Sequence, residues 1–229
     1  MPSIMITSAN RGLGLEFARQ YAADGWHIFA ACRNPQSAVD LRDLARDGSV
    51  TIFPMDVTDP LSVEHAKTEF AGEAVDVLIN SAGIFGKQNQ KAGSVDYETW
   101  KQVLDVNTLG PLRVIEAFID QITRSDRKLA VTITSGMGSL ADNMSGGAIP
   151  YRSSKAAVNM VMRSAAIDLA QRGVACVLVN PGWVKTDMGG PGAPLTPAES
   201  VAALKRLIAT LGFAQSGKFF NYDGREYPW

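Results

Sequence analysis

The 229-residue sequence has few residues of the types that build disulfide frameworks and metal centres. It contains 2 cysteines, Cys32 and Cys176, and 2 histidines, His27 and His65. Two cysteines so far apart are too few for a disulfide scaffold and lack the spacing of zinc ligands. We therefore predict buried strand thiols, ordinary structural or surface histidines, and no metal site.

The sequence also lacks an excess of basic charge and a long apolar run. It has 22 Lys and Arg against 23 Asp and Glu, a formal charge of −1, which argues against nucleic-acid binding and a polybasic membrane anchor. Its first apolar run stops far short of the roughly 20 residues that a membrane helix needs, and no targeting pattern precedes it. We expect one soluble, cytoplasmic domain over residues 1–229, with 46% hydrophobic residues available for its core.

The sequence does contain a repeated alternation of short β-rich apolar runs and helical patterns. We predict strands at residues 4–7, 27–32, 50–54, 75–80, 129–134, 174–179 and 218–221. We predict helices at residues 12–23, 38–46, 60–70, 97–123 and 151–170, and a last helix that starts with a capping box at Thr196. This order predicts a single-domain α/β protein of the Rossmann type, a doubly wound parallel sheet with helices on both faces. Ligands bind such sheets beyond the carboxyl ends of the strands.

A glycine-containing loop follows the first predicted strand and opens the first helix. It reads Thr7-Ser8-Ala9-Asn10-Arg11-Gly12-Leu13-Gly14. Glycines let a backbone approach a pyrophosphate closely, and the free N–H groups of a helix start bind its charge. Many strand-to-helix turns need glycine only for a positive φ, so the simpler interpretation as a turn stays open.

The end of the second predicted strand bears on cofactor choice. NAD-selective sheets usually carry an acidic residue there to bind the ribose 2′-hydroxyl, but this chain has Cys32-Arg33-Asn34. Arg33, with Arg11 from the glycine loop, could pair with a 2′-phosphate, which favours NADP(H) over NAD(H). The alternative is two solvated surface arginines. Asp56 and Val57, after the third strand, lie where an adenine contact is expected, although Asp56 could equally form a turn.

Four polar residues form a candidate catalytic set. Tyr151 and Lys155 are four positions apart and share one helix face. A nearby ammonium favours a phenolate, so Lys155 is expected to lower the pKa of Tyr151 and prepare it to exchange a proton with a carbonyl or alcohol. Ser135 follows the fifth strand and adds a hydroxyl. Asn107 lies mid-helix, an unfavourable place for asparagine, where it could also mark only a kink.

Taken together, these motifs resemble those of the single-domain short-chain dehydrogenase/reductases over essentially the whole chain. The resemblance is strongest to carbonyl reductases of the Sniffer and C-factor type, through Asn-Arg-Gly-Leu-Gly, Cys-Arg-Asn-Pro, Gly146-Gly147 and the ending that starts at Asn221. It further rests on Asn80-Ser81-Ala82-Gly83, Asn107 within 105–110, Ser135, Tyr151 to Lys155, and Pro181 to Thr186.

The resemblance implies a role for each matching residue. Tyr151 would be the general acid/base, Lys155 would hold the nicotinamide ribose, Ser135 would bond the substrate oxygen, and Asn107 would position a water. The implied cofactor, NADP(H), would contact Ser8, Asn10, Arg11, Gly12, Leu13, Gly14, Arg33, Asp56, Val57, Asn80, Ala82, Gly83, Tyr151, Lys155, Pro181, Gly182, Val184 and Thr186.

The chain departs from the family pattern at two positions. Ser8 replaces the first glycine of the usual loop, where special dihedral angles or a close approach are expected, so it could weaken cofactor binding. Ser81 replaces an asparagine, a milder change. We expect the substrate pocket to be apolar, with the loop 187–195 as a lid, and its candidate lining residues are Phe85, Met137, Met144, Ile149, Trp183 and Met188.

The predicted function is NADPH-dependent reduction of a ketone or aldehyde, a small-molecule substrate. Two alternatives stay open: an NADP(H)-binding signalling or regulatory protein of C-factor type with secondary catalysis, and the reverse reaction, alcohol oxidation with NAD. The resemblance also implies a homodimer or homotetramer, although monomeric carbonyl reductases exist.

Overall fold

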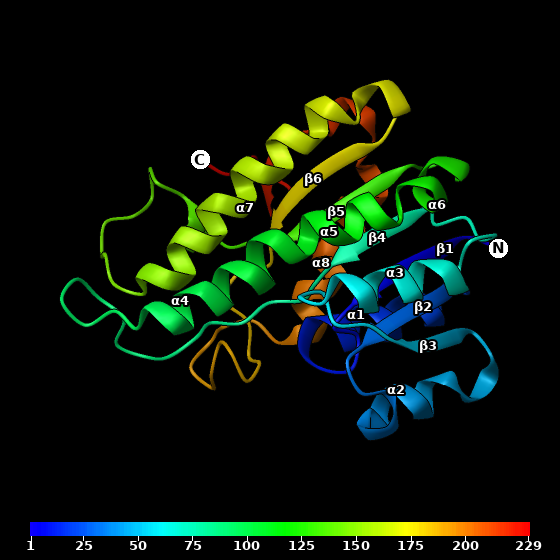
Figure 1. Ribbon diagram of the computed structural model, residues 1–229, viewed down its shortest axis with the longest axis horizontal. Coiled ribbons are helices and arrows are strands. Elements are labelled where there is room, and N and C mark those ends of the chain that lie inside the picture. The colour runs from blue at the N-terminus through cyan, green and yellow to red at the C-terminus, as the bar shows by residue number, and fades with distance from the viewer.

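A single sheet of seven strands organises the computed structural model, which describes residues 1–229 (Figure 1). Every neighbouring pair of strands is parallel, in the order β3-β2-β1-β4-β5-β6-β7. The strands are β1 (Ser3–Thr7), β2 (His27–Cys32), β3 (Val50–Pro54), β4 (Val77–Asn80), β5 (Leu129–Ile133), β6 (Ala175–Asn180) and β7 (Phe219–Asn221). The predicted doubly wound parallel sheet is confirmed.

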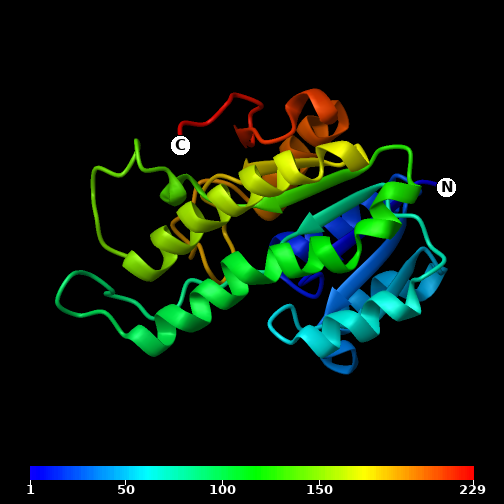
Figure 2. The same cartoon turned by 45° about the horizontal axis from the view of Figure 1, so that its top comes forward.

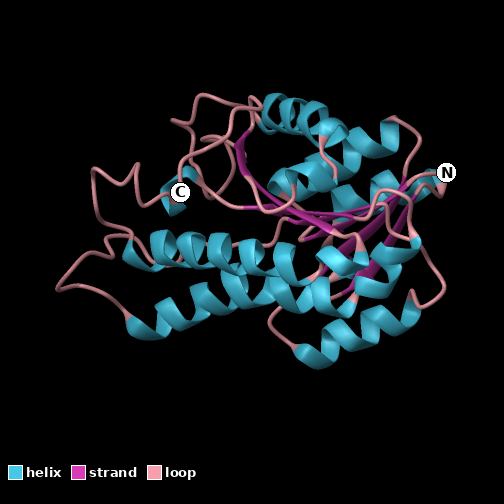
Figure 3. Ribbon diagram, turned by 90° about the horizontal axis from the view of Figure 1, so that it is seen from above, coloured by secondary structure: helices cyan, strands magenta, loops and turns pink.

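Helices cover both faces of this sheet (Figure 3). They are α1 (Gly12–Ala23), α2 (Val39–Leu44), α3 (Pro60–Glu69), α4 (Tyr97–Leu104), α5 (Gly110–Ala117), α6 (Ile119–Arg124), α7 (Ile149–Asp168) and α8 (Pro197–Thr210). Successive strand side chains point to opposite faces, so Ile4 and Ile6 enter the core beside α1 and α8, whereas Met5 enters the core beside α3, α5 and α7. Strands buried on both faces explain the continuous apolar runs in the sequence.

The direction of winding reverses between β1 and β4, which are neighbours in the sheet. From β1 the chain continues outward to β2 and β3, and from β4 it continues the other way to β5 and β6. Such a reversal leaves a crevice at the carboxyl ends of the strands. The loops after β4, β5 and β6 extend from that same end of the molecule, opposite the N-terminus (Figures 1 and 2).

The predicted helix over 97–123 is present, but it is not a regular α-helix throughout. It is divided into α4, a π-helical segment η3 (Asp105–Leu109), α5 and α6. The interruption has a tertiary cause: within η3, Asn107 and Thr108 use their side chains to bond Ser154 of α7. Insertions of this kind are frequent at functional sites.

Other boundaries differ by smaller amounts. The predicted helix over 38–46 is only the six-residue α2, which lies between short 3₁₀ turns, and Gly48 closes the second turn with a φ of 81°. At α8 the predicted capping box is present, because Thr196 Oγ1 accepts from Glu199 N while the Glu199 carboxylate accepts from Thr196 N. None of the helices combines the length and apolar character that a bilayer crossing requires.

Candidate active site

The glycine loop connects β1 to α1 through two unusual backbone positions. Ser8 and Gly12 both have a φ of 55°, in the left-handed region. A serine there costs about 1–2 kcal/mol relative to a relaxed conformation, so the position does need special dihedral angles. Gly14 is required for another reason, because a Cβ atom on it would lie 2.3 Å from the Ser8 carbonyl oxygen. The loop therefore folds tightly over the start of α1.

The loop after β4 is held against this glycine loop by Thr7. Its Oγ1 accepts hydrogen bonds from the backbone N–H groups of Ser81 and Ala82, both at 3.0 Å. Ser81 stands where the family pattern has asparagine. Because its backbone N–H, and not its side chain, makes the bond with Thr7, this difference does not disturb the contact. Gly83 follows, and a Cβ atom on it would lie 3.4 Å from Asn107 Oδ1 and 3.7 Å from Lys155 Nζ. The two loops and the candidate catalytic residues thus meet at one edge of the sheet.

A cavity of about 440 Å³ opens beside the glycine loop at the ends of β2 and β3. Among the predicted cofactor residues it is lined by Ser8, Asn10, Arg11, Arg33, Asp56, Val57, Ala82 and Gly83. Asp56 also forms the turn, since its Oδ1 accepts from Thr58 N and Thr58 Oγ1, while its adenine contact stays a prediction. The sequence prediction missed Asn34, Ser37 and Thr58 in the lining, although Asn34 adjoins Arg33.

Tyr151 and Lys155 lie on the first turns of α7, and both are buried. Lys155 Nζ donates to the carbonyl oxygen of Ile133 at 2.9 Å and lies 5.7 Å from the centre of the Tyr151 ring. Ser135 is the second residue after β5, and it lines the same cavity as Tyr151. Gly138 allows this arrangement, because a Cβ atom there would lie 2.7 Å from the Lys155 backbone.

The electrostatics of this pair differ from the expectation that Lys155 lowers the pKa of Tyr151. Burial raises the pKa of Tyr151, and the smaller, opposite effect comes from the Ser135 side chain. Burial also lowers the pKa of Lys155 to about 8. Without cofactor the ammonium donates to the Ile133 carbonyl, and the effect of Lys155 on Tyr151 in the loaded enzyme stays a prediction.

Asn107 is almost fully buried and all its polar atoms have protein partners. Its Nδ2 donates to Ile84 O at 2.8 Å and to Ser154 Oγ at 3.0 Å, and its Oδ1 accepts from Ile84 N at 2.8 Å. These bonds connect η3 to the loop after β4 and to α7. Asn107 therefore lies in the π-helical segment of the helix and beside Lys155 and Gly83, and its role in positioning a water stays a prediction.

Two further cavities continue from the first one across the end of the sheet. One, of about 550 Å³, lies between the glycine loop, Lys155 and the segment 185–188, and shares Ser8, Arg11 and Gly83 with the first cavity. The other, of about 590 Å³, reaches Ser135 and shares Tyr151, Leu13 and Thr186 with the second. Because the three cavities share lining residues, they form one groove from Arg33 to Tyr151. The groove is also lined by the predicted residues Gly12, Gly14, Pro181, Gly182 and Val184.

Comparison with known proteins is consistent with this geometry. The family model described as short chain dehydrogenase matches residues 2–193. This chain belongs to the short-chain dehydrogenase family. It is 47% identical to the C-signal protein of Myxococcus xanthus over 155 residues, which cover 68% of this chain and 93% of that protein.

Two solved structures resemble this short-chain dehydrogenase over its full length. Carbonyl reductase Sniffer of D. melanogaster has a TM-score of 0.94 and 32% identity, with 100% of both chains covered. The NADPH-bound carbonyl reductase from chicken fatty liver has a TM-score of 0.93 and 32% identity, covering 100% of this chain and 99% of that one. The predicted family, fold and enzyme class are confirmed.

Not every predicted site residue of this short-chain dehydrogenase faces the groove. The Asn80 side chain is buried and donates to Pro111 O at 3.2 Å, so it connects β4 to α5 and does not line the three cavities. Met144, which is 92% exposed, and Ile149 are also absent from the substrate-side lining, whereas Phe85, Met137, Trp183 and Met188 are present. Apolar character alone does not reveal which way a loop side chain points.

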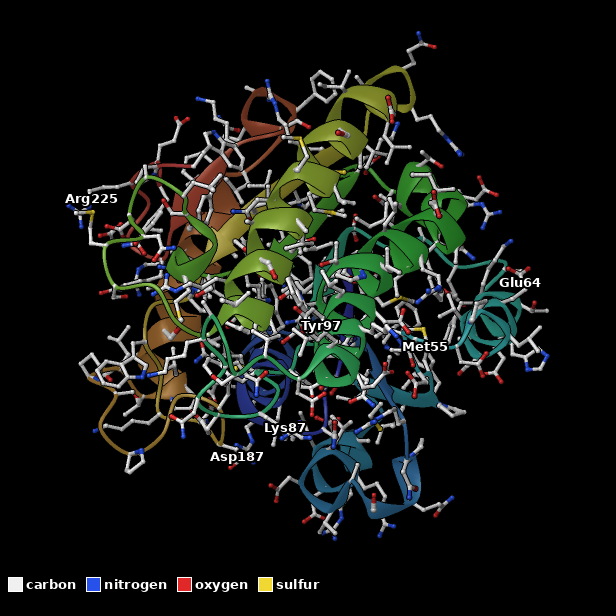
Figure 4. All side chains as sticks on the ribbon, turned by 60° about the vertical axis from the view of Figure 1, so that its left-hand side comes forward. Met55, Glu64, Lys87, Tyr97, Asp187 and Arg225 are labelled. Carbon is white, nitrogen blue, oxygen red and sulfur yellow. The ribbon has the colours of Figure 1, made fainter.

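The predicted lid, residues 187–195, is held in place by hydrogen bonds to the segment that precedes it. Trp183 Nε1 donates to Gly189 O at 2.8 Å, and Lys185 N donates to Leu195 O at 2.8 Å. Asp187 reaches across the groove, where its carboxylate lies 3.4 Å from Arg11 Nη1. Figure 4, which brings this end of the molecule forward, shows Asp187 on the loop after β6 and Lys87 on the loop after β4.

Proposed function

We propose that this enzyme is an NADPH-dependent reductase of ketones or aldehydes, with Tyr151, Ser135, Lys155 and Asn107 at its catalytic centre. The observation that carries the proposal is that Tyr151 and Ser135 together line the end of the long groove, in its cavity of about 590 Å³. Such a position brings a proton donor beside a place for a small molecule, with the groove available for a dinucleotide.

The lining of the groove suits NADP(H) in shape and charge. Gly14 and the left-handed Gly12 leave the backbone open to a pyrophosphate, and the N-terminus of α1 points at it. Arg11 and Arg33 line the same cavity, where Arg33 has no carboxylate partner and Arg11 contacts only the exposed Asp187. Two available guanidinium groups without an acid at the end of β2 favour a 2′-phosphate. The reduced nicotinamide supplies the hydride when it is bound.

The chain's own task is to orient the carbonyl and deliver one proton. The Ser135 hydroxyl and the Tyr151 phenol would both bond the carbonyl oxygen, and Tyr151 would protonate it as negative charge develops there. The raised pKa of Tyr151 keeps the phenol protonated at neutral pH, as a proton donor requires. Lys155 would bind the nicotinamide ribose, and Asn107 would act as a positioning residue through Ile84 and Ser154.

A regulatory role with NADP(H) as ligand is the second candidate. It is favoured by the similarity to C-signal and by the left-handed Ser8 in the glycine loop. This role needs cofactor binding but no turnover, whereas the reductase needs both. Oxidation of alcohols would use the same residues in the opposite direction. A cytoplasmic location and a homodimer or homotetramer stay predictions; exposed Met160 and Ile167 on α7 are compatible with a helix-mediated interface.

The proposal is tested with purified protein, NADPH and a panel of quinones, aromatic ketones and aldehydes. NADPH oxidation is followed by absorbance, with Tyr151→Phe as the background and NADPH affinity measured separately by fluorescence. Turnover of at least one carbonyl that is lost in Tyr151→Phe supports the reductase. Tight NADPH binding with no turnover across the panel would support the regulatory role instead.

A further inference from the structure

The C-terminal residues of the chain form one wall of the substrate cavity, a feature that the sequence did not reveal. Tyr227 N donates to Phe219 O at 2.7 Å, and the Tyr227 ring packs on Phe219 with ring centres 5.0 Å apart. The carbonyl oxygen of Trp229 accepts from Ser139 Oγ and from Ala141 N, at 3.0 and 2.9 Å. The end of the chain is therefore fastened across the loop that follows Ser135.

These hydrogen bonds place the Tyr227 hydroxyl next to the loop that follows Ser135. A Cβ atom on Gly136 would lie 2.6 Å from Tyr227 Oη and 3.5 Å from Asn180 Nδ2, so only glycine allows the phenol to come this close. Gly136 directly follows Ser135, and Tyr227, Ser135 and Tyr151 line the same cavity of about 590 Å³. The Tyr227 hydroxyl thus lies within the reach of a molecule bound at Tyr151.

The hydrogen bonding of Tyr227 determines what it can offer to a ligand. Its hydroxyl donates to Asp142 Oδ2 at 2.8 Å, and Asp142 has no Lys or Arg partner. The phenolic proton is thereby used, and the lone pairs of Tyr227 Oη and of Asp142 Oδ1 are free to accept. Burial and the neighbouring carboxylate both raise the pKa of Tyr227, which keeps its proton on that bond.

Arg152 is the other charged residue in this lining, and three of its five N–H donors have protein partners. Nε, Nη1 and Nη2 donate to Gly146 O, Met137 O and Ser145 Oγ. These bonds hold the guanidinium in place, whereas Asp142 Oδ1 has no protein partner, so the test below includes a carboxylate ligand that Arg152 would favour.

We propose that Tyr227 and Asp142 form a specificity subsite that accepts a hydrogen bond from a hydroxyl or amino group on the substrate, at a distance from the reacting carbonyl. This inference rests on the proposed reductase function. It selects ketones and aldehydes that carry a second, donating polar group over purely apolar ones, and it disfavours substrates with a carboxylate.

The test compares two ketones of nearly equal size, 4′-(hydroxymethyl)acetophenone and 4′-ethylacetophenone. In the wild type we expect kcat/KM to favour the hydroxymethyl ketone by roughly 2- to 12-fold, the range for one ordinary hydrogen bond, because Asp142 is exposed to solvent. In Tyr227→Phe and in Asp142→Asn this ratio should fall toward one. Tyr97→Phe, on the exposed face of α4, is the matched control and should keep the wild-type ratio.

Binding measurements separate a failure of the subsite from a failure of the reductase function. Ligand-observed NMR with the same two ketones in the presence of NADP⁺ reports affinity without any reduction. A preference for the hydroxymethyl ketone that disappears in Tyr227→Phe supports the subsite even if the wild type turns over neither ketone. An unchanged ratio in Tyr227→Phe, or a wild-type preference for 4-acetylbenzoate that depends on Arg152, would overturn it.

Discussion

Replacing Gly14 by alanine tests the tight glycine loop more sharply than any other single change. The new Cβ atom would lie 2.3 Å from Ser8 O, 2.9 Å from Ser8 C and 3.1 Å from the Ala9 Cα. All three are backbone atoms, so no rotamer change can relieve the clash. The loop would have to retreat by about 1 Å to restore an ordinary contact distance.

The loss of folding stability expected for Gly14→Ala is best judged against that of Gly12→Ala. Overpacking against a fixed neighbour costs roughly 1–3 kcal/mol and sometimes more, and we place Gly14→Ala at the upper end. Gly12→Ala has space, because its nearest atom is Thr186 Cγ2 at 3.8 Å, so it carries only the left-handed strain. That strain, partly offset by a less flexible unfolded chain, comes to about 1 kcal/mol.

Thermal unfolding without cofactor measures the difference. One kcal/mol corresponds to roughly 2–4 °C in a domain of this size, so Gly14→Ala should lower Tm by about 6–12 °C and Gly12→Ala by about 2–4 °C. Equal losses for the two variants would refute the reasoning, because they would show that the Gly14–Ser8 contact does not limit the loop.

Three further outcomes follow from the groove. Ser8→Gly removes the left-handed strain and should raise Tm by about 1–4 °C, as thermal unfolding would show; a lower Tm would mean that the serine side chain stabilises the loop. Arg33→Asp should weaken NADPH binding at least about tenfold while NADH binding holds or improves, measured by fluorescence titration; an unchanged preference would remove Arg33 from the cofactor site. Because burial lowers the pKa of Lys155 to about 8, its ammonium is lost as pH rises through that value. NADPH affinity should therefore fall above about pH 8 in the wild type and stay flat in Lys155→Met.

The fold could be predicted because its signals are local. Apolar strands, the glycine loop after β1 and the capping box at Thr196 each depend on neighbouring residues, and all three are present. The break at η3 depends instead on bonds from Asn107 and Thr108 to Ser154, which is more than 40 positions away in the sequence. No helical pattern within 97–123 could show that interruption.

The candidate site was predictable only as far as its motifs extend. Tyr151, Ser135 and the glycine loop follow strand ends or share a helix face, so their meeting at one sheet edge could be expected. Tyr227 and Asp142 were missed because they come from separate loops that the C-terminal residues bring together. The pKa shifts of Tyr151 and Lys155 were also beyond the sequence, since they arise from burial.

Tyr151→Phe, assayed for both chemistry and cofactor binding, tests the central claim most directly. The substitution keeps the aromatic ring, which packs 4.8 Å from Phe85, and removes only the hydroxyl. If Tyr151 delivers the proton, kcat/KM for an accepted carbonyl should fall by about 10²- to 10⁴-fold, while the Kd for NADPH changes by far less. Turnover equal to that of the wild type would contradict the account.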